Sequence, residues 1–383
     1  MPAEQPPASS SSIHMVDLFA GPGGLDVAAH WLGIEAHGIE WDPDAVATRE
    51  QAKLRTELGD VRRFEPRNFR RDRAGDQAAP GSRPDMTILA GGPPCQTYTV
   101  AGNGAGRQAL NHVIEMIDLM IDGENVTEAL QELHKQTGDE RTGLVLEPLR
   151  WALEAYKEGE AYDVIVLEQV PAVLPVWKRI AHALEKIGYF AEAGVLHAEE
   201  YGVPQTRRRA ILMARRTSRP RMPSPTHERY RKGMKQHDCG MVLLPWKSMG
   251  DALDRRDFKV ISNYGTGGDP KARGNRNWDE PSATVTGKIS RNRLQSTITG
   301  QDLPRFTNAE AGQLQTFPRD YPWSDRNTAQ QIGNAIPPRL AVHVLAAALD
   351  SPVDSAALDD AVNGSWFATM NGVDGLSPKL RLF

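Results

Sequence analysis

A short apolar run followed by a glycine-rich turn sets the strongest limit on the fold of this 383-residue chain. The run at residues 14–19 has the character of a buried strand, residues 20–26 include three glycines, and helical spacing then continues through Trp31. Strand, glycine-rich turn and helix in this order bring backbone N–H groups close to a nucleotide-like ligand in α/β proteins. The turn lacks the G-x-G-x-x-G spacing of dinucleotide sites, so a tight turn without a ligand is the alternative.

Acidic residues follow this turn at the ends of further predicted strands. Residues 36–40 form a second short strand that ends in Glu40, and Trp41 comes directly after it. An acid about 20 residues after the turn suits hydrogen bonds to ribose hydroxyls, and an indole offers a face to adenine. Asp60 lies at another strand or loop edge, where it can accept from an adenine amino group. Each acid alone is more often a solvated surface charge, but together they predict a ligand at the carboxyl edge of a sheet.

The stretch at residues 91–102 carries Cys95, one of the two cysteines of the chain. It follows a β-branched apolar run, residues 86–90, that predicts a buried strand. Two glycines and two prolines then fix a sharp turn before the thiol, and a small, polar segment follows. A rigid thiol beside a mobile loop suits a nucleophile. The same pattern fits a small buried cysteine in a turn equally well.

Two later strands supply an acid and a set of polar residues. Residues 162–167 predict a buried strand that ends in Glu168. Farther along the chain, strand alternation places Gln205, Arg207 and Arg209 on one face, just before an apolar run at residues 210–213. These polar groups are therefore expected at the mouth of a buried sheet.

Composition excludes several classes of protein. Two cysteines rule out a disulfide framework and a cysteine-rich zinc site, and no metal site is expected. The chain shows neither a secretory signal pattern nor an apolar run near the roughly 20 residues of a membrane span, which predicts a cytoplasmic protein. The net charge of −4 hides a basic run: residues 207–235 hold eleven Lys or Arg and one acid, Glu228. Such a run is typical of a phosphate-binding face, with a solvated linker as the alternative.

In their order, these motifs resemble those of the cytosine-C5 DNA methyltransferase family of bacteria and phages, which uses S-adenosylmethionine as methyl donor. The resemblance covers roughly residues 15–350 and rests on Phe19–Gly24, Glu40-Trp41, Asp60, Gly92–Gln96, the Gln-x-Arg-x-Arg motif from Gln205 to Arg209, and Gln331–Pro338. It implies an α/β fold: a Rossmann-like S-adenosylmethionine-dependent methyltransferase domain with a mostly parallel sheet flanked by helices, plus a smaller irregular target-recognition domain.

The resemblance also implies roles for individual residues. Cys95 would add to carbon-6 of a flipped-out cytosine, Glu168 would stabilise the ring nitrogen, and Arg209 would hold the exocyclic oxygen. The implied catalytic set is completed by Arg207 and Gln205. The donor pocket would be lined by Phe19, Gly21, Gly23, Leu25, Glu40, Trp41, Asp60, Pro93 and Asn334. Contacts to DNA are expected from Gln96, Thr97, Arg273 and Arg276.

The expected domains follow the same resemblance. They are a disordered tail (1–12), a catalytic domain (13–215), a target-recognition domain (216–320), a segment that returns to the catalytic domain (321–350) and a loosely packed tail (351–383). Two departures from the family pattern stand out. Residues 107–138 form an insertion, expected to be a helical pair packed on the core or else a device that contacts DNA or limits loop closure. Gln169 replaces the usual Asn after Glu168, which puts the geometry of the cysteine loop in doubt.

Two other functions are compatible with these motifs. One is an RNA (tRNA) cytosine-C5 methyltransferase, which the long recognition domain and the absence of a Cys-Phe-Thr signature disfavour. The other is a non-catalytic DNA-binding relative, which the intact nucleophile, acid and arginines disfavour. The expected partners are double-stranded DNA, which would associate the protein with the nucleoid, and a separately encoded restriction endonuclease. Nothing in the sequence predicts an oligomer.

Overall fold

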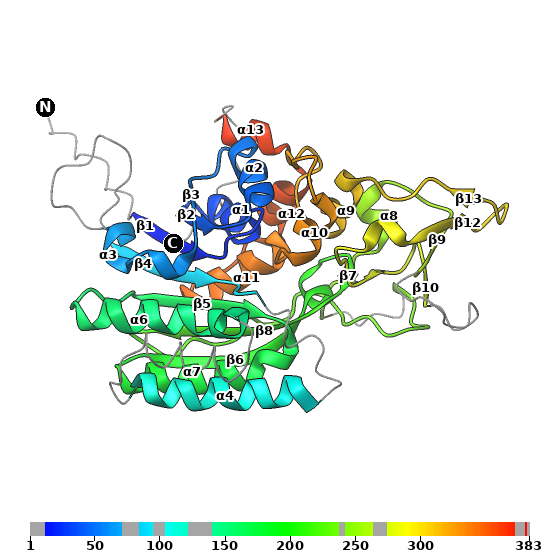
Figure 1. The fold of residues 1–383 in the computed structure, drawn as a ribbon. Coiled ribbons are helices and arrows are strands. Elements are labelled where there is room, and N and C mark those ends of the chain that lie inside the picture. The colour runs from blue at the N-terminus through cyan, green and yellow to red at the C-terminus, as the bar shows by residue number, and fades with distance from the viewer. Residues whose placement is uncertain are drawn as a thin grey trace, which may run out of the picture.

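The computed structural model describes residues 12–70, 84–94, 104–121, 140–236, 242–262, 274–371 and 380. A seven-stranded sheet in the order β3-β2-β1-β4-β5-β8-β6 forms the centre of the large domain (Figure 1). Neighbours from β3 to β5 are parallel, whereas β8 is antiparallel to both β5 and β6. The strands are β1 (Ile13–Leu18), β2 (Glu35–Glu40), β3 (Thr56–Leu58), β4 (Met86–Gly91), β5 (Val164–Gln169), β6 (Phe190–His197) and β8 (Arg208–Arg215).

Helices cover both faces of this sheet (Figure 1). One face carries α1 (Gly24–Trp31) and α11 (Pro338–Ala348), and the other carries α4 (Gly104–Ile121), α6 (Glu147–Lys157) and α7 (Leu174–Lys186). Two further helices, α2 (Pro43–Gln51) and α3 (Pro66–Arg70), follow β2 and β3. The alternation within β1 explains the two layers, since Met15 packs into one apolar cluster and Val16 and Leu18 pack into the other. The expected α/β architecture with a mostly parallel sheet is confirmed.

The described part of the insertion is the helix α4. Val113, Met116, Ile117 and Met120 are buried at helical spacing, and Arg179 Nε of α7 donates to Asp118 Oδ1 over 2.6 Å. This helix therefore packs on the core, as the first of the two expectations for the insertion states. Residues 122–139, which hold the second expected helix, lie outside the described residues.

The smaller domain contains more regular structure than expected. An antiparallel sheet joins β10 (Asn275–Asn277), β9 (Phe258–Ile261), β12 (Arg293–Ser296) and β13 (Asp302–Leu303). Its apolar face shares a core with α8 (Met249–Leu253), α9 (Asn308–Leu314) and α10 (Thr328–Asn334). A parallel pair, β7 (Gln205–Thr206) with β11 (Ser282–Ala283), links the two domains.

The chain after β8 stays on the large domain before it enters the smaller one. Arg219 Nη1 donates to the Ala191 carbonyl over 2.8 Å, and the N–H groups of Thr226 and His227 both donate to the Glu200 carbonyl over 2.9 Å. The expected boundary at residue 216 therefore needs correction, because residues 219–227 are bonded to β6 and the segment after it.

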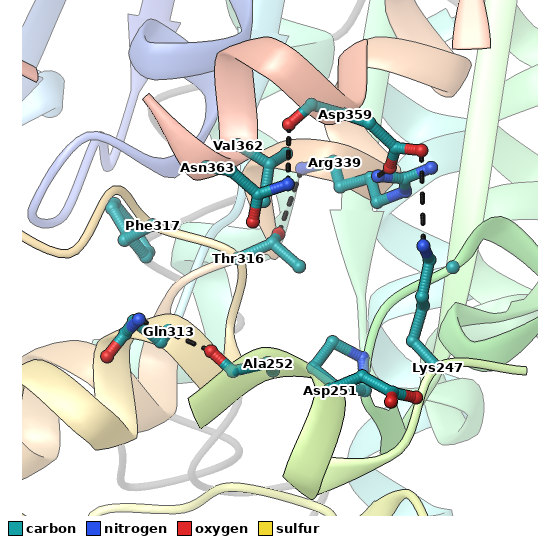
Figure 2. A pocket seen from close by; sticks show the side chains of 12 residues that line it. Lys247, Asp251, Ala252, Gln313, Thr316, Phe317, Arg339, Asp359, Val362 and Asn363 are labelled. Atoms are coloured by element: carbon teal, nitrogen blue, oxygen red, sulfur yellow. Dashed lines mark hydrogen bonds and ion pairs between the residues drawn. The ribbon is translucent and has the colours of Figure 1, made fainter. Parts of the chain in front are cut away.

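The expectation of a loosely packed tail at 351–383 is wrong for the residues described. Helices α12 (Ser355–Asn363) and α13 (Trp366–Met370) bury Leu358, Ala361 and Trp366 in the large core. The apolar side chains fall at helical spacing within an otherwise polar segment, a signal for a docked helix. Figure 2 shows a second anchor, where Asp359 of α12 pairs with Arg339 of α11 over 2.5 Å and lies 3.9 Å from Lys247.

Candidate active site

The glycine-rich turn after β1 adopts a backbone that few residue types tolerate. Phe19, Gly21 and Gly23 have φ values of 61°, 55° and 103°. A Cβ at Gly23 would lie 2.4 Å from Leu54 Cδ1 and 3.0 Å from the Tyr321 hydroxyl, whereas one at Gly21 would meet nothing within 4 Å. The turn is therefore packed from beneath at Gly23 and open at Gly21, as a cradle for a ligand requires.

Glu40 connects this turn to the end of β2. Its carboxylate accepts from the backbone N–H groups of Gly21 (2.7 Å), Trp41 (2.9 Å) and Asp42 (2.8 Å). Burial raises the pKa of Glu40, and the three hydrogen bonds oppose that rise. The adjacent Trp41 side chain is 71% exposed, which is unusual for so large an apolar group.

Of the other residues predicted to line the donor pocket, Asp60 and Asn334 are accessible to solvent, whereas Leu25 is buried. Asp60 begins a short helical turn, and its carboxylate accepts from the Arg62 backbone N–H (3.0 Å) and pairs with the Arg62 guanidinium (2.6 Å). Burial acts to raise the pKa of Asp60, but these contacts with Arg62 lower it overall. Asn334 is exposed at the end of α10 and accepts from Gln330 Nε2 over 2.7 Å. In contrast, the Leu25 side chain is buried in the core beneath α1 rather than facing the turn.

Hydrogen bonds hold the returning segment (321–350) against α2. Thr48 Oγ1 of α2 donates to Gln331 Oε1 of α10 over 2.6 Å, and Gln331 Nε2 donates to the Asp44 carbonyl over 3.0 Å. Because Asn334 lies one helical turn after Gln331, these bonds fix the position of its helix relative to α2.

The second part of the site is built at the ends of the neighbouring strands β4 and β5. Glu168 is 7% exposed, and Arg209 Nε of β8 lies 2.5 Å from Glu168 Oε1. A Cβ at Gly92 would lie 3.3 Å from Glu168 Oε2, so the chain after β4 passes directly over this carboxylate. The acid and Arg209 are therefore together beside the glycine–proline turn.

Gln169 supports the same turn despite its departure from the family pattern. Its amide group donates to the Pro93 carbonyl, and its Oε1 accepts from the Val170 N–H. The longer side chain therefore reaches the turn that leads to the cysteine. Cys95, Gln96, Thr97 and Arg273 lie outside the described residues.

Gln205 and Arg207 do not point toward Glu168. Arg207 lies between β7 and β8, fully buried, and donates to three carbonyls, Val285 (2.9 Å), Gly333 (2.9 Å) and Ala335 (2.9 Å). Burial and the charge of Arg209 lower the pKa of Arg207. Gln205 accepts from the Val285 N–H over 3.0 Å and donates to the Leu314 carbonyl over 2.8 Å. Both residues thus join the two domains, and only Arg209 reaches the acid.

A buried ion pair beneath the donor turn was not anticipated from the sequence. Asp26 of α1 accepts two bonds of 2.8 Å from Arg49 of α2, and neither residue is exposed to solvent beyond about 1%. Asp17 lies next to this pair, where burial and the Asp26 charge raise the pKa of Asp17 well above its usual range. The sequence signal for this buried pair is the glycine at position 38, because a Cβ there would lie 1.9 Å from Arg49 Nη2.

Arg276 is engaged within the smaller domain. Its guanidinium lies 4.6 Å from the centre of the Tyr230 ring and donates to the Tyr230 hydroxyl over 2.7 Å, and that hydroxyl in turn donates to Glu280. The neighbouring Asn275 and Asn277 are exposed on the opposite face of β10. The residues of β10 that are free to meet a partner are thus the two asparagines.

Much of the basic run is open to solvent. The exposed members include Arg208, Arg216, Arg221, Arg229, Arg231, Lys232 and Lys235. Burial and the charges of Arg229 and Arg208 lower the pKa of His197 to about 4, which places both arginines near the end of β6. That end of the sheet is also where β5 delivers Glu168, so positive charge flanks the acid.

A cavity of about 100 Å³ lies elsewhere, between α8, α9, α11 and α12 (Figure 2). Its twelve lining residues include none of the predicted site residues. In the described ranges, no group of three or more His, Cys, Asp or Glu residues is placed to hold a metal ion. None of the helices described is long and apolar enough to cross a membrane.

Comparisons with known proteins address the family directly. The family model for C-5 cytosine-specific DNA methylase matches residues 13–131, 133–242 and 236–349. The chain is 26% identical over 366 residues to the type II methyltransferase M.NgoFVII of Neisseria gonorrhoeae, covering 87% of this chain and 85% of that protein. It is also 26% identical over 243 residues to M.AquIA of Picosynechococcus, covering 62% of this chain and 87% of that protein.

Solved structures support the fold. The Entamoeba histolytica methyltransferase EhMeth superposes with a TM-score of 0.54 at 15% identity, over 89% of this chain and 99% of that one. The S. pombe Dnmt2 methyltransferase gives a TM-score of 0.54 at 16% identity, over 88% and 98%. With the family match spanning nearly all of residues 13–349, the chain belongs to the C-5 cytosine-specific DNA methylase family and is a DNA cytosine-5-methyltransferase that uses S-adenosylmethionine.

Proposed function

We propose that the chain methylates carbon-5 of a cytosine swung out of duplex DNA, through a covalent bond between Cys95 and carbon-6. The observation that carries this proposal is the pairing of Glu168 with Arg209 directly beneath the turn that leads to Cys95. An acid and a guanidinium side by side match the ring nitrogen and exocyclic oxygen of one cytosine edge. The base must leave the stack to reach them, at a cost of a few kcal/mol.

The residues of the donor turn fit S-adenosylmethionine. Gly21 leaves space where a side chain would stand, Trp41 exposes its ring, and Glu40 presents a buried carboxylate. We assign the donor pocket to Phe19, Gly21, Gly23, Glu40, Trp41, Asp60, Pro93 and Asn334, with Leu25 contributing through its backbone. When bound there, S-adenosylmethionine supplies an electrophilic methyl group.

The residues around the base would then act in sequence. The Cys95 sulfur forms a bond to carbon-6, and the electron pair of the carbon-5–carbon-6 double bond moves toward the N3–O2 edge. Glu168 shares a proton with N3 there, and Arg209 donates to O2, so the added charge is stabilised. Carbon-5 takes the methyl group as the methyl–sulfur bond of the donor breaks and leaves a neutral thioether. Solvent then accepts the proton that carbon-5 loses. The sulfur–carbon bond then breaks, which restores the aromatic ring and the thiolate.

Arg207 and Gln205 would serve this reaction by position rather than by contact. Arg207 holds the carbonyls of Val285, Gly333 and Ala335, and Gln205 holds the backbone of Val285. They thereby fix the recognition domain and the Asn334 segment relative to β8. The exposed arginines Arg208 and Arg229 flank the site and would contact DNA phosphates. Gln96, Thr97, Arg273 and Arg276 keep their proposed contacts to DNA, although Arg276 would have to leave Tyr230 to make one.

The test is methylation of mixed-sequence duplex DNA with tritiated S-adenosylmethionine, followed by bisulfite sequencing. Protected cytosines in one recurring context would support the proposal, and competition with tRNA separates the RNA alternative. Cys95→Ala should abolish methylation while donor binding is retained, and Glu168→Gln should lower turnover at least 100-fold, by about 2.7 kcal/mol of barrier. Turnover like that of the wild type in either variant would contradict the assigned role.

The relatives suggest a biological setting. M.NgoFVII and M.AquIA are named type II methyltransferases, and we propose that this chain likewise protects DNA from a separately encoded endonuclease and acts as a monomer. DNA methylated by the chain should then resist an endonuclease that cuts the same context, and light scattering should give one chain per particle. Cleavage of fully methylated DNA at that context would contradict the pairing.

A further inference from the structure

The C-terminal extension, residues 351–383, lies beyond the family match, and its described helices α12 and α13 pack against the large domain. Asp320 accepts bonds from Ser365 Oγ (2.5 Å) and from the Trp366 N–H (2.8 Å), which anchors the start of α13. The buried Trp366 indole donates to the Ala52 carbonyl at the end of α2 over 3.2 Å. Its ring lies 5.3 Å from that of His30, near the end of α1. The extension thus contacts both helices that flank the donor turn.

Tyr321 connects this extension to the turn itself. Its ring lies 5.5 Å from that of Trp366 and is also packed against Phe317 (4.8 Å) and Trp323 (4.9 Å). Its hydroxyl donates to the buried Pro22 carbonyl, inside the turn. The contacts therefore run without a gap from α13 through one tyrosine to the backbone of the turn.

The turn needs outside support because its own backbone is strained. Phe19 has a positive φ although it is not a glycine, and such a conformation persists only where surrounding contacts fix it. Removal of the Tyr321 hydroxyl would leave the Pro22 carbonyl short of a partner in a site that excludes water. A turn released in this way would populate other conformations, and a ligand that needs the strained one would bind less tightly.

We propose that the C-terminal extension braces the donor turn, with Trp366 and Tyr321 as positioning residues for S-adenosylmethionine. This inference rests on the proposed donor pocket at Phe19–Gly24. If the extension merely covered the core, its loss would lower stability without a specific effect on donor affinity. A brace instead predicts weaker donor binding and a looser turn in a protein that is still folded.

The first experiment uses Tyr321→Phe, which keeps the ring and removes the hydroxyl. Tyr189→Phe is the matched control, because the buried Tyr189 hydroxyl donates to the Tyr162 carbonyl over 2.6 Å in the other apolar cluster. Calorimetry with S-adenosylmethionine on the DNA-free protein should give an about fivefold higher Kd for Tyr321→Phe and an unchanged Kd for Tyr189→Phe. Hydrogen exchange of residues 19–27 without donor should quicken in the first variant alone.

A second pair tests the extension itself. Trp366→Leu should raise the donor Kd and the KM for donor while kcat at saturating donor and the KM for DNA stay unchanged. Phe367→Leu, at a side chain that is 41% exposed in the same helix, should change none of these. The conservative Trp366→Phe should recover part of the affinity, which keeps the test open where Trp366→Leu fails to fold.

The outcomes separate the inference from the proposed function. Wild-type protein that does not bind S-adenosylmethionine would contradict the donor pocket. Wild-type binding together with a Kd within twofold for folded Tyr321→Phe and Trp366→Phe would overturn the brace and leave the pocket intact. Equal weakening in the Tyr189→Phe control would also overturn it, since the effect would then be one of general stability.

Discussion

The buried ion pair between Asp26 and Arg49 allows a quantitative test of the packing beneath the donor turn. Two bonds of 2.8 Å join the side chains, and Arg49 Nε also donates to Thr56 Oγ1 over 2.8 Å. Asp26→Asn keeps the shape but removes the carboxylate that accepts both bonds, and leaves Asp17 as an acidic neighbour of the guanidinium. Breaking a fully buried pair in this way costs about 3–5 kcal/mol of unfolding free energy. Because the asparagine oxygen can retain one bond, we expect about 3 kcal/mol.

The double variant Asp26→Leu/Arg49→Met distinguishes this reasoning from simple loss of contacts. Apolar residues of similar volume remove both charges together, so neither is left without a partner, and such replacements are often close to neutral. We expect the double variant to be within about 1 kcal/mol of the wild type and more stable than either single variant.

Urea unfolding of the donor-free protein, followed by fluorescence and far-UV circular dichroism, provides the measurement. The two probes must give coincident transitions and one m value across the set for the free energies to be comparable. Additive losses, with the double variant as unstable as the sum of the singles, would refute the argument that the uncompensated charge dominates.

Three further predictions follow from particular contacts. Gln169→Leu removes the bond to the Pro93 carbonyl, so turnover should fall about tenfold while donor binding is unchanged. Initial rates and calorimetry measure the two effects. An unaltered rate would show that the bond does not position the cysteine turn. Gly24→Ala should cost about 2–3 kcal/mol in urea unfolding, because its Cβ would lie 2.4 Å from the Ile336 carbonyl. A neutral result would mean that the backbone at Ile336 can shift. Burial, with the Arg339 charge, lowers the pKa of His343 to about 3, so stability that is present above pH 6.5 should be lost as the pH falls toward 3. In unfolding series from pH 7 to 4.5, His343→Gln should reduce the slope of unfolding free energy against pH by up to about 1.4 kcal/mol per pH unit.

The local elements of the donor side could be predicted because they depend on neighbouring residues. Short stretches around Gly21 and Glu40 indicate a buried strand, a glycine-rich turn and an acid at the end of the next strand. The parallel neighbours β1, β2 and β3 are joined by the helices α1 and α2, as parallel strands require. The position of Glu168 beside Gly92 is a direct consequence of β4 and β5 being neighbours.

The partners of the arginines could not be predicted in this way. The expectation that strand alternation places Gln205, Arg207 and Arg209 on one face was wrong, because the chain leaves the strand at Arg207. The Arg207 side chain binds carbonyls 78 to 128 residues away. Arg276 was expected to meet DNA, yet it stacks on Tyr230. A guanidinium donates to the acceptors that the tertiary fold places near it, and the spacing of residues in the sequence does not reveal these acceptors. The docked extension was missed because its apolar residues are few and lie among polar ones.

The three carbonyl bonds of Arg207 also define where this protein can be recombined with its relatives. Val285 belongs to the core of the smaller domain, whereas Gly333 and Ala335 belong to the returning segment. One side chain therefore bonds to both segments. The strip up to His227 is bonded to the large domain. A chimaera that exchanges only residues 228–280 would keep every one of these bonds. Grafts cut at residues 216 and 320 would instead replace Val285 and its surroundings. The transplanted recognition domain would then be oriented by contacts that this chain does not supply.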